Sequence, residues 1–372
     1  MSSPLRRLGL LLPPVLLCAA CRTLPRAASA RAVSPAALLA AIDSLRRAAQ
    51  IPGLAAVVLQ DTTVIASHGF GVADMVSQRP VTPETPFNIA SVSKPISAVV
   101  AMQLVERGVL SLDRPMRQYA GFDEFCTAAR GDGGIFFGDF TCLDDRLTLR
   151  HVLSMTMNGT PGSRFLYNPP GYSWASRPMA EVTGVPFSAL VDSLVLRPAG
   201  MRNAARINRR LPLRDDLAAQ LAQPYHVDSA GRVTPSGPPP PQGDGAAGGV
   251  IASAMDLARF DVALMTDRLL SRASRTALWT PTVTTDGTEL PYGLGWFLGS
   301  WNGRRVAWHT GVWEGRYSAL YLKVLSDDPR QRATLILLAN SDALQWPSAL
   351  NEAAIERSPF ARVFLEWAVP RQ

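Results

Sequence analysis

Ser91 and Lys94 are the residues whose types and spacing point most directly to chemistry. Apolar residues recur with helical spacing through residues 87–107, which predicts a helix with Ser91 at or just inside its start. Lys94 would then lie beside Ser91 on one helix face. A serine hydroxyl becomes a strong nucleophile when a neighbouring amine with a lowered pKa takes its proton. The N–H groups at a helix start also favour an oxyanion. The pair therefore predicts an activated nucleophile.

The choice of lysine at position 94 supports this interpretation. The chain has 37 basic residues, of which only Lys94 and Lys323 are lysines. Arginine does not give up its proton in proteins, so a retained lysine suits proton transfer. The alternative is a capped surface helix with a stray lysine.

Two further stretches carry candidate partners for Ser91. Tyr167 lies in an aromatic turn rich in glycine and proline, where its phenolate or hydroxyl could handle a proton. His309, Thr310 and Gly311 follow a predicted strand, where glycine lets a substrate approach and a backbone N–H can complete an oxyanion hole. The alternatives are a packing tyrosine and a hydrogen-bonded structural histidine.

The elements that must position these residues alternate between strands and helices. Helices are expected after Ser34 and over the Ser91 segment, and a hairpin is expected over 54–60 and 63–70 with its turn at Asp61 and Thr62. Further helices are expected over 147–155, 185–196, 255–270 and 347–367, a proline-rich loop over 232–247, and antiparallel strands over 292–300, 304–308, 318–325 and 334–339.

This order predicts an α+β fold in which strands from both ends of the chain share one sheet. The expected sheet lobe covers about 35–90 and 290–372, and a mostly helical lobe covers about 91–289. The cleft between such lobes is where a ligand is expected.

Composition narrows the class of function. The chain has 372 residues, is 47% hydrophobic and can bury a large core. Its net charge of +7 comes from dispersed arginines without a basic run, so we expect no nucleic-acid partner. The four histidines are far apart and match no zinc-ligand spacing, so we expect no metal and no other cofactor.

Residues 1–30 have the pattern of an export signal: Arg6 and Arg7, a short apolar run, then small residues. Cleavage after Ala30 would release a mature domain of residues 31–372. Alternatively, the segment before Cys21 resembles a bacterial lipobox, which would make Cys21 a lipid anchor and the only membrane attachment. Both alternatives predict an exported bacterial protein, periplasmic or lipid-anchored.

Cys126 and Cys142 are the cysteines of the expected mature chain. In an oxidising compartment they can form a disulfide that pins the glycine-rich segment between them. The alternative is two unpaired cysteines.

In order along the chain, Ser91-x-x-Lys94, Tyr167 and His309-Thr310-Gly311 resemble the serine β-lactamase and penicillin-binding-protein superfamily, in its class C β-lactamase-related branch. That branch includes esterases, D-alanyl-D-alanine carboxypeptidases and D-aminopeptidases. The resemblance extends over about 36–345, and its further segments are 104–113, 147–153, 197–201, 247–260 and 292–296. It implies the β-lactamase/transpeptidase-like fold, with an antiparallel sheet flanked by helices.

The resemblance also implies roles for matching residues. Ser91 would attack a carbonyl and form an acyl-enzyme, while Lys94 and Tyr167 would manage its proton and activate the deacylating water. His309 matches the first position of the family's Lys-Thr-Gly motif, where esterase-like members often carry histidine. The oxyanion hole would be made by the N–H groups of Ser91 and Val312.

One departure bears on the substrate. The family's Tyr-x-Asn is Tyr167-Asn168-Pro169 here, so the asparagine that would bind a substrate amide is missing at its usual position. Unless Asn168 compensates, a hydrogen bond of about 1–3 kcal/mol is lost, which disfavours β-lactams and muropeptides more than esters.

We therefore predict an exported serine hydrolase of esterase, D-alanyl-D-alanine carboxypeptidase or β-lactamase type. Its substrates would be small carboxylic esters or peptide-like amides, with peptidoglycan fragments among the candidates; Asn168, Thr310, Gly311 and Val312 would bind them. The alternative is a protein of the same fold that binds penicillin or a cell-wall fragment without turnover, because fold does not fix function.

Overall fold

The structure is a computed structural model that describes residues 34–131, 138–140, 145–345 and 353–370. Residues from Val33 onward group into one compact unit. The expected export signal, Cys21 and Cys142 lie outside the described residues. Their roles stay predictions.

A seven-stranded antiparallel sheet runs through this unit in the order β3-β2-β1-β12-β11-β10-β9. The strands are β1 Gly53–Gln60, β2 Thr63–Asp74, β3 Arg79–Pro80, β9 Phe297–Trp301, β10 Arg304–Trp313, β11 Tyr317–Val324 and β12 Ala333–Ala339. The N-terminal and C-terminal parts of the sheet meet where β1 pairs with β12, Leu54 opposite Ala339. The expected hairpin, the shared sheet and the α+β class are confirmed.

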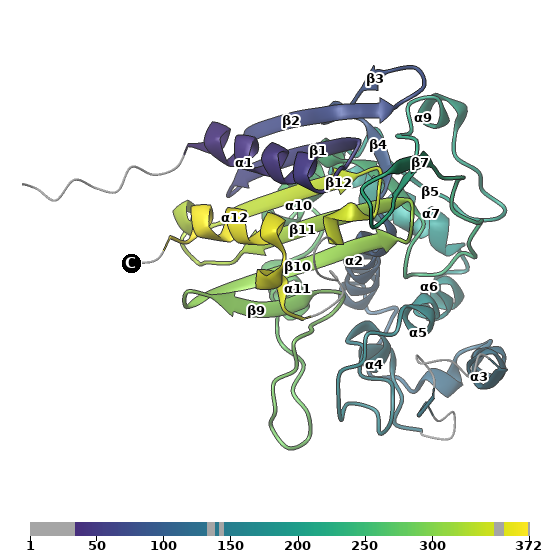
Figure 1. Cartoon of the computed structure of the whole chain (residues 1–372). Coiled ribbons are helices and arrows are strands. Elements are labelled where there is room, and N and C mark those ends of the chain that lie inside the picture. Colours follow the sequence, from purple (N-terminus) through teal and green to yellow (C-terminus); the bar gives the residue numbers. More distant parts are fainter. Residues whose placement is uncertain (1–33, 132–137, 141–144, 346–352, 371–372) are drawn as a thin grey trace, which may run out of the picture. The chain divides into compact units, whose positions relative to one another are not determined.

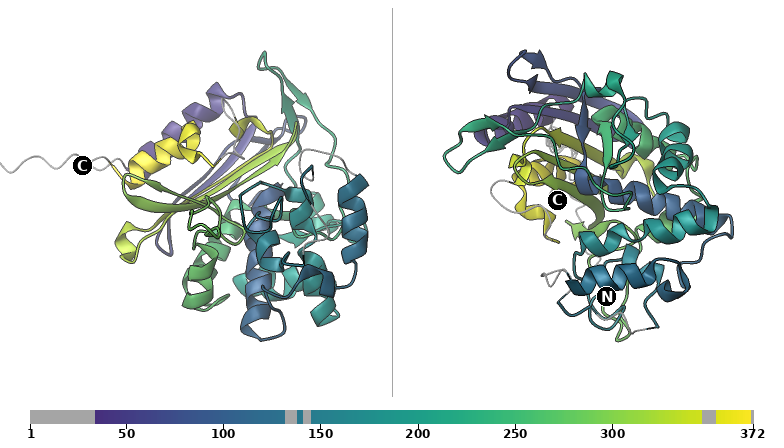
Figure 2. Two further views of the ribbon diagram at one scale, coloured as in Figure 1. Left: turned by 90° about the horizontal axis from the view of Figure 1, so that it is seen from below. Right: turned by 90° about the vertical axis from the view of Figure 1, so that its right-hand side faces the viewer.

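Helices cover both faces of the sheet. On one face, α1 Pro35–Ala48 contacts β1 and β2, while α12 Pro359–Ala368 contacts β11, and the two helices pack on each other (Figure 1). On the other face, α10 Ala254–Met265 contacts β1 and β12, and α2 Ser93–Glu106 contacts β10 (Figure 2). Ser34 caps α1, its hydroxyl accepting from the N–H of Ala37 at 3.2 Å.

The middle of the chain is largely helical, with small sheets among the helices. Its helical elements are η2 Met116–Gln118, α3 Phe122–Gly131, α4 Leu149–Leu153, α5 Pro169–Ser173, α6 Ser176–Thr183, α7 Phe187–Val191, the π-helical η3 Asp192–Leu196, α8 Arg197–Ala199, α9 Asp215–Ala218 and α11 Arg272–Leu278. A three-stranded sheet combines β4 Pro86–Asn88 with β8 Val250–Ser253 and β5 Ala205–Arg206. A hairpin joins β6 Tyr225–Val227 to β7 Val233–Pro235.

Helix α2 is buried on all sides. Every residue from Ser93 to Leu104 is buried, including Lys94 and Gln103. A helix that is mostly apolar all round belongs in a core. This burial excludes the capped surface helix as an environment for Lys94.

Several expected boundaries differ from the structure. The strand expected over 292–300 begins only at Phe297, because a turn with Gly295 at φ +77° occupies the segment before it. Strand β10 continues to Trp313, five residues past the expected end. The last helix, expected over 347–367, begins at Pro359; residues 346–352 lie outside the described part. Residues 233–235, expected to be loop, form β7.

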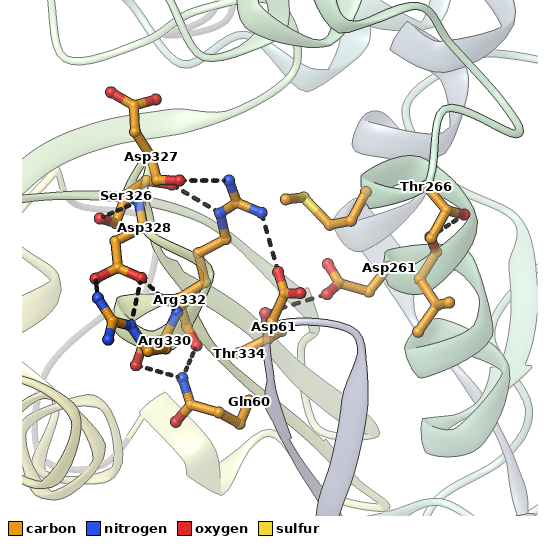
Figure 3. Close-up of polar contacts among 12 residues, drawn as sticks. Gln60, Asp61, Asp261, Thr266, Ser326, Asp327, Asp328, Arg330, Arg332 and Thr334 are labelled. Atoms are coloured by element: carbon orange, nitrogen blue, oxygen red, sulfur yellow. Dashed lines mark hydrogen bonds and ion pairs between the residues drawn. The ribbon is translucent and has the colours of Figure 1, made fainter.

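A polar cluster ties together the turns at one end of the sheet (Figure 3). Arg332, before β12, binds Asp61 in the β1–β2 turn at 3.0 Å and the Ser326 carbonyl at 2.7 Å. Thr334 donates to the buried Asp261 of α10 at 3.2 Å. Asp261 also pairs with Lys323. The second lysine of the chain is therefore part of a buried ion pair between α10 and the sheet.

Cys126 is disulfide-bonded. Since Cys142 is not described, the pairing of these two cysteines remains a prediction. Within the described ranges, no single helix is long and apolar enough to cross a membrane; one bent pair, Pro169–Thr183 with Phe187–Ala199, passes by length and composition.

Candidate active site

Ser91 lies in a short 3-10 turn, η1 Ala90–Val92, between β4 and α2. Ala90 has a φ of +45°, uncommon for a residue with a Cβ, and its N–H donates to the Asn88 side chain at 2.9 Å. Such strained positions persist where the surroundings enforce them, as they often do at functional sites. The expected placement of Ser91 at a helix start agrees with this geometry.

Lys94 reaches the hydroxyl of Ser91 from the first turn of α2. Its Nζ lies 2.7 Å from Ser91 Oγ and 3.0 Å from the carbonyl oxygen of Ala247. Burial of the side chain lowers the pKa of Lys94 well below its usual value. A neutral amine at this distance can accept the serine proton.

The second lysine of the chain, Lys323, has a different environment from Lys94. Lys323 is equally buried, and burial lowers its pKa, but the carboxylate of Asp261 acts in the opposite direction. Lys94 is instead held by a hydroxyl and a backbone carbonyl. The environment of Lys94 therefore favours proton transfer, and that of Lys323 favours a structural ion pair.

Tyr167 lies next to this pair. Lys94 Nζ is 5.1 Å from the centre of the Tyr167 ring, which stacks on Phe297 at 5.5 Å. Burial raises the pKa of Tyr167 above its usual value, although a hydrogen bond with Ser91 acts in the opposite direction. Of the two forms considered from the sequence, the structure favours the protonated hydroxyl.

His309 is buried in β10, and both of its ring nitrogens have partners. Nδ1 lies 2.7 Å from the carbonyl oxygen of Thr310, and Nε2 lies 3.0 Å from the hydroxyl of Tyr292. A carbonyl only accepts, so Nδ1 carries the proton and Nε2 accepts from Tyr292. Burial, with Lys94 adding to it, lowers the pKa of His309 well below its usual value. The neutral ring, 6.0 Å from that of Tyr167, is suited to positioning.

The end of β10 offers backbone groups to a ligand. Strand β9 pairs only with residues 304–308 of β10, so on that side Gly311 and Val312 extend beyond their neighbouring strand. Thr310, which also lies past β9, has its carbonyl oxygen bound by His309. A Cβ at Gly311 would lie 2.2 Å from the carbonyl oxygen of Ile89, so glycine lets β10 pack against the Ser91 turn. This contact brings the predicted oxyanion residues, Ser91 and Val312, into neighbouring segments.

Asn168 is placed differently from our expectation of a substrate contact. The side chain is fully buried; its Oδ1 caps α5 by accepting from the N–H of Gly171 at 2.8 Å. Its Nδ2 donates to Asn158 at 2.9 Å. The role of Asn168 in this structure is therefore structural, because its side-chain amide caps the helix α5 that begins at Pro169.

Residues that the sequence did not single out complete the site. Tyr172 donates to the carbonyl oxygen of Lys94 at 3.1 Å, and Tyr292 orients His309. The carbonyl of Ala247 binds Lys94. Tyr292 lies in a segment that carried the family resemblance, and Tyr172 does not. No spacing rule connects either residue with Ser91, because they approach the site only in the folded chain.

Comparisons with known proteins show which family the chain resembles. The family model described as "Beta-lactamase" matches residues 38–357. Penicillin-binding protein 4* of Bacillus subtilis (strain 168) is 29% identical over 319 residues, which cover 78% of this chain and 69% of that protein. Esterase EstB of Burkholderia gladioli is 29% identical over 236 residues, 54% of this chain and 57% of its own length. The match thus spans less than two thirds of the esterase.

Solved structures show the same fold. The penicillin-binding protein homologue from Pyrococcus abyssi superposes with a TM-score of 0.66 at 22% identity and covers 82% of this chain and 73% of its own. The D-amino acid amidase from Ochrobactrum anthropi gives 0.65 at 19% identity, covering 89% and 97%. The family model spans most of the sequence, and its relatives include an esterase and a penicillin-binding protein. The chain therefore belongs to the beta-lactamase family of serine hydrolases.

Proposed function

We propose that this protein is an exported serine hydrolase that forms an acyl-enzyme on Ser91 and acts on small carboxylic esters or peptide-like amides. The observation that carries the proposal is the 2.7 Å contact between Ser91 Oγ and the buried amine of Lys94. A buried amine with a lowered pKa beside a hydroxyl is an arrangement for nucleophilic catalysis.

In the acylation step, Ser91 Oγ bonds to the substrate carbonyl carbon while its proton passes to Lys94 Nζ. The negative charge that develops on the carbonyl oxygen is stabilised by the N–H groups of Ser91 and Val312. The carbon–leaving-group bond then breaks, and the leaving group takes the proton through Lys94 or the Tyr167 hydroxyl.

In the deacylation step, the same groups act on water. Water loses a proton to the Lys94–Tyr167 pair and adds to the acyl carbon, and the bond to Ser91 Oγ breaks as the proton returns to that oxygen. His309 takes no proton in this scheme, because both of its ring nitrogens are engaged. The role of His309 is to position the neighbouring residues of the site.

Esters are the preferred substrate class. The Asn168 amide caps α5 and binds Asn158, so it does not replace the family's missing asparagine. Loss of one hydrogen bond to an acylamino group costs about 1–3 kcal/mol of binding free energy. A simple ester has no acylamino group and does not need this hydrogen bond. The relatives include both an esterase and a D-aminopeptidase.

Export is supported by the pattern of residues 1–30 and by the disulfide at Cys126, because disulfides persist in oxidising compartments. We propose a periplasmic location, with a lipid anchor at Cys21 as the alternative to cleavage after Ala30. The substrate is small in either case, and peptidoglycan-derived amides remain candidates.

The test measures the intact mass of the mature domain after treatment with a fluorophosphonate, a p-nitrophenyl ester or penicillin, with product release followed in parallel. We expect one adduct per chain and turnover of the ester. Ser91→Ala should lose both, whereas Ser44→Ala, an exposed serine on α1, should keep them. An unchanged rate in folded Ser91→Ala would refute the assignment.

A binding protein without turnover is the second candidate. It is favoured by the engagement of Asn168, which removes one contact to an amide substrate. It predicts a stable penicillin adduct on Ser91 with negligible release, and no ester turnover. Rapid ester turnover would exclude it.

A further inference from the structure

Tyr167 is held from both sides by a buried loop, residues 154–158, which follows α4. Met155 accepts from the N–H of Leu166 through its carbonyl oxygen at 3.0 Å and from the N–H of Asn168 through its sulfur at 3.2 Å. These two contacts bracket Tyr167 in the chain. Met155 has a φ of +58°, which is uncommon for a residue with a Cβ and persists where the surroundings enforce it. The loop therefore fixes the backbone on either side of the tyrosine.

A chain of side-chain hydrogen bonds runs from the same loop to the surface. Asn168 Nδ2 donates to Asn158 Oδ1 at 2.9 Å, and Asn158 Nδ2 donates to Asp139 Oδ1 at 2.9 Å. The other carboxylate oxygen of Asp139 pairs with Arg164. Both asparagines are fully buried, whereas Asp139 is exposed. The chain thus connects the residue after Tyr167 with a charge at the surface.

The carboxylate of Asp139 sets the direction of every hydrogen bond in this chain. The hydrogen bond from Asn158, with Arg164 adding to it, keeps the pKa of Asp139 below its usual value, so the group is ionised at neutral pH. An ionised carboxylate only accepts, so Asn158 must turn its NH₂ group toward Asp139 and its oxygen toward Asn168. Asn168 then presents its NH₂ group to Asn158 and its oxygen to the N–H of Gly171, at 2.8 Å. The direction of the chain is the one that caps α5.

Tyr167 is the catalytic group that this arrangement reaches. Its hydroxyl has a hydrogen bond with Ser91, and its ring lies 5.1 Å from Lys94 Nζ. The next residue, Asn168, is fixed by the sulfur of Met155 at its N–H and by Asn158 at its side chain. A shift of about 1 Å in a reacting group can cost about 10²-fold in rate. Contacts that fix Asn168 therefore bear on proton transfer at Ser91.

From these contacts we propose that Asp139, Asn158 and Asn168 are positioning residues that hold the Tyr167 hydroxyl in place for proton transfer at Ser91. They act through Tyr167 and do not touch the substrate. The inference rests on the proposed acyl-enzyme function and extends it to residues that lie between the catalytic tyrosine and the surface.

The test exchanges the two ends of the chain. Asn168→Asp keeps an oxygen for the N–H of Gly171 but turns a second oxygen toward Asn158, whose NH₂ group is already engaged by Asp139. We expect kcat/KM for a p-nitrophenyl ester to fall about 10²-fold. Adding Asp139→Asn lets the Asn158 amide turn round, because it can then accept from the new amide and donate to the new carboxylate. The double variant should recover at least about tenfold of the loss.

A second readout separates positioning from a general loss of structure. Tyr167→Phe removes the hydroxyl, and its kcat/KM should fall about 10²–10⁴-fold. Adding Asn168→Asp to Tyr167→Phe should lower kcat/KM by no more than about threefold further, because the group that the chain positions is already gone. Melting curves of all variants show which of them are folded.

If Asn168→Asp does not fold, Asp139 tests the chain from the surface. Asp139→Ala removes the acceptor of Asn158 and should lower kcat/KM about tenfold, whereas Asp139→Asn keeps an acceptor and should lose less than about threefold. The matched control is Asp145→Ala, which removes another exposed aspartate paired with an arginine, Arg117, and should leave kcat/KM unchanged.

The outcomes distinguish this inference from the proposed function. Turnover that depends on Ser91 is measured first in the wild type, and without it both the proposed function and the positioning role are wrong. With such turnover, the positioning role alone would be overturned by any of three results: an unchanged rate in folded Asn168→Asp or no recovery in its double variant, equal losses with and without the Tyr167 hydroxyl, or equal rates in Asp139→Ala and Asp139→Asn.

Discussion

At the scale of single residues, the burial of Lys94 decides the chemistry. Burial lowers the pKa of Lys94 well below its usual value and so favours the neutral amine. We expect Lys94→Met to fold and to unfold at no lower temperature than the wild type, while acylation by a p-nitrophenyl ester falls about 10²–10⁴-fold. Stopped-flow acylation with a parallel melting curve measures both. A folded variant with wild-type acylation would remove Lys94 from the mechanism.

The same burial predicts a pH dependence. Protonated Lys94 cannot accept the Ser91 proton. The acylation rate should therefore fall as the pH decreases through the lowered pKa of Lys94, and it should reach its maximum above that pKa. The rising limb of the acylation rate should therefore lie well below pH 10.5. In Lys94→Met this limb should disappear. A limb that persists in the variant would assign the titration to another group.

Lys323 provides the opposite case. It pairs with Asp261 in the core, and Lys323→Met would leave that carboxylate buried without its cation. We expect a loss of about 3–5 kcal/mol in the free energy of unfolding, measured with urea, while the acylation rate of the remaining folded protein is unchanged. Adding Asp261→Asn to this variant should recover part of the lost free energy of unfolding. A fully stable single variant would contradict the ion pair.

At the scale of elements, the contact between β10 and the Ser91 turn sets the width of the site. Gly311→Ala would place a Cβ 2.2 Å from the Ile89 carbonyl oxygen and push β10 away from η1. We expect ester turnover to fall by at least about 10²-fold, since loss of one oxyanion donor alone costs that much. Gly237→Ala is the matched control, because no atom lies within 4 Å of its added Cβ. Equal activity in both variants would show that the close approach is not needed.

The sequence predicted elements well where the pattern is local. Ser91 and Lys94 are three residues apart on one helix, so their contact follows from helical spacing alone. The predicted strand over 304–308 ends five residues before the observed end of β10 at Trp313. In the folded chain Gly311 continues the strand, since it is the residue that can pack against Ile89.

Contacts between distant segments could not be predicted in this way. Tyr292 reaches His309, and Tyr172 reaches the carbonyl of Lys94, through packing of separate elements. The position of Asn168 directly after Tyr167 predicts a contact with the substrate, but in the structure the side-chain amide of Asn168 caps α5. The types of the site residues are readable from the sequence, while their partners depend on tertiary structure.

At the scale of the whole molecule, the disulfide at Cys126 bears on stability and location. We expect peptide mapping without reduction to link Cys126 to Cys142. Closing such a loop is worth about 3 kcal/mol in the chain-entropy model, so Cys142→Ser should lower the free energy of unfolding by about that amount. Ester turnover at low temperature should persist. A link from Cys126 to another cysteine would contradict the pairing.

The pairing of β1 with β12 has a consequence for how the protein is made. Leu54 lies opposite Ala339, so one edge of the first hairpin has no partner until nearly the whole chain has left the ribosome. Helices can form as they emerge, but the main sheet waits for its last strand, and pairings between such distant segments form slowly. A chain stopped before β12 would expose the apolar face of β1 and invite aggregation. For the export that we propose, the same delay would keep the newly made polypeptide unfolded during its passage through a translocation channel.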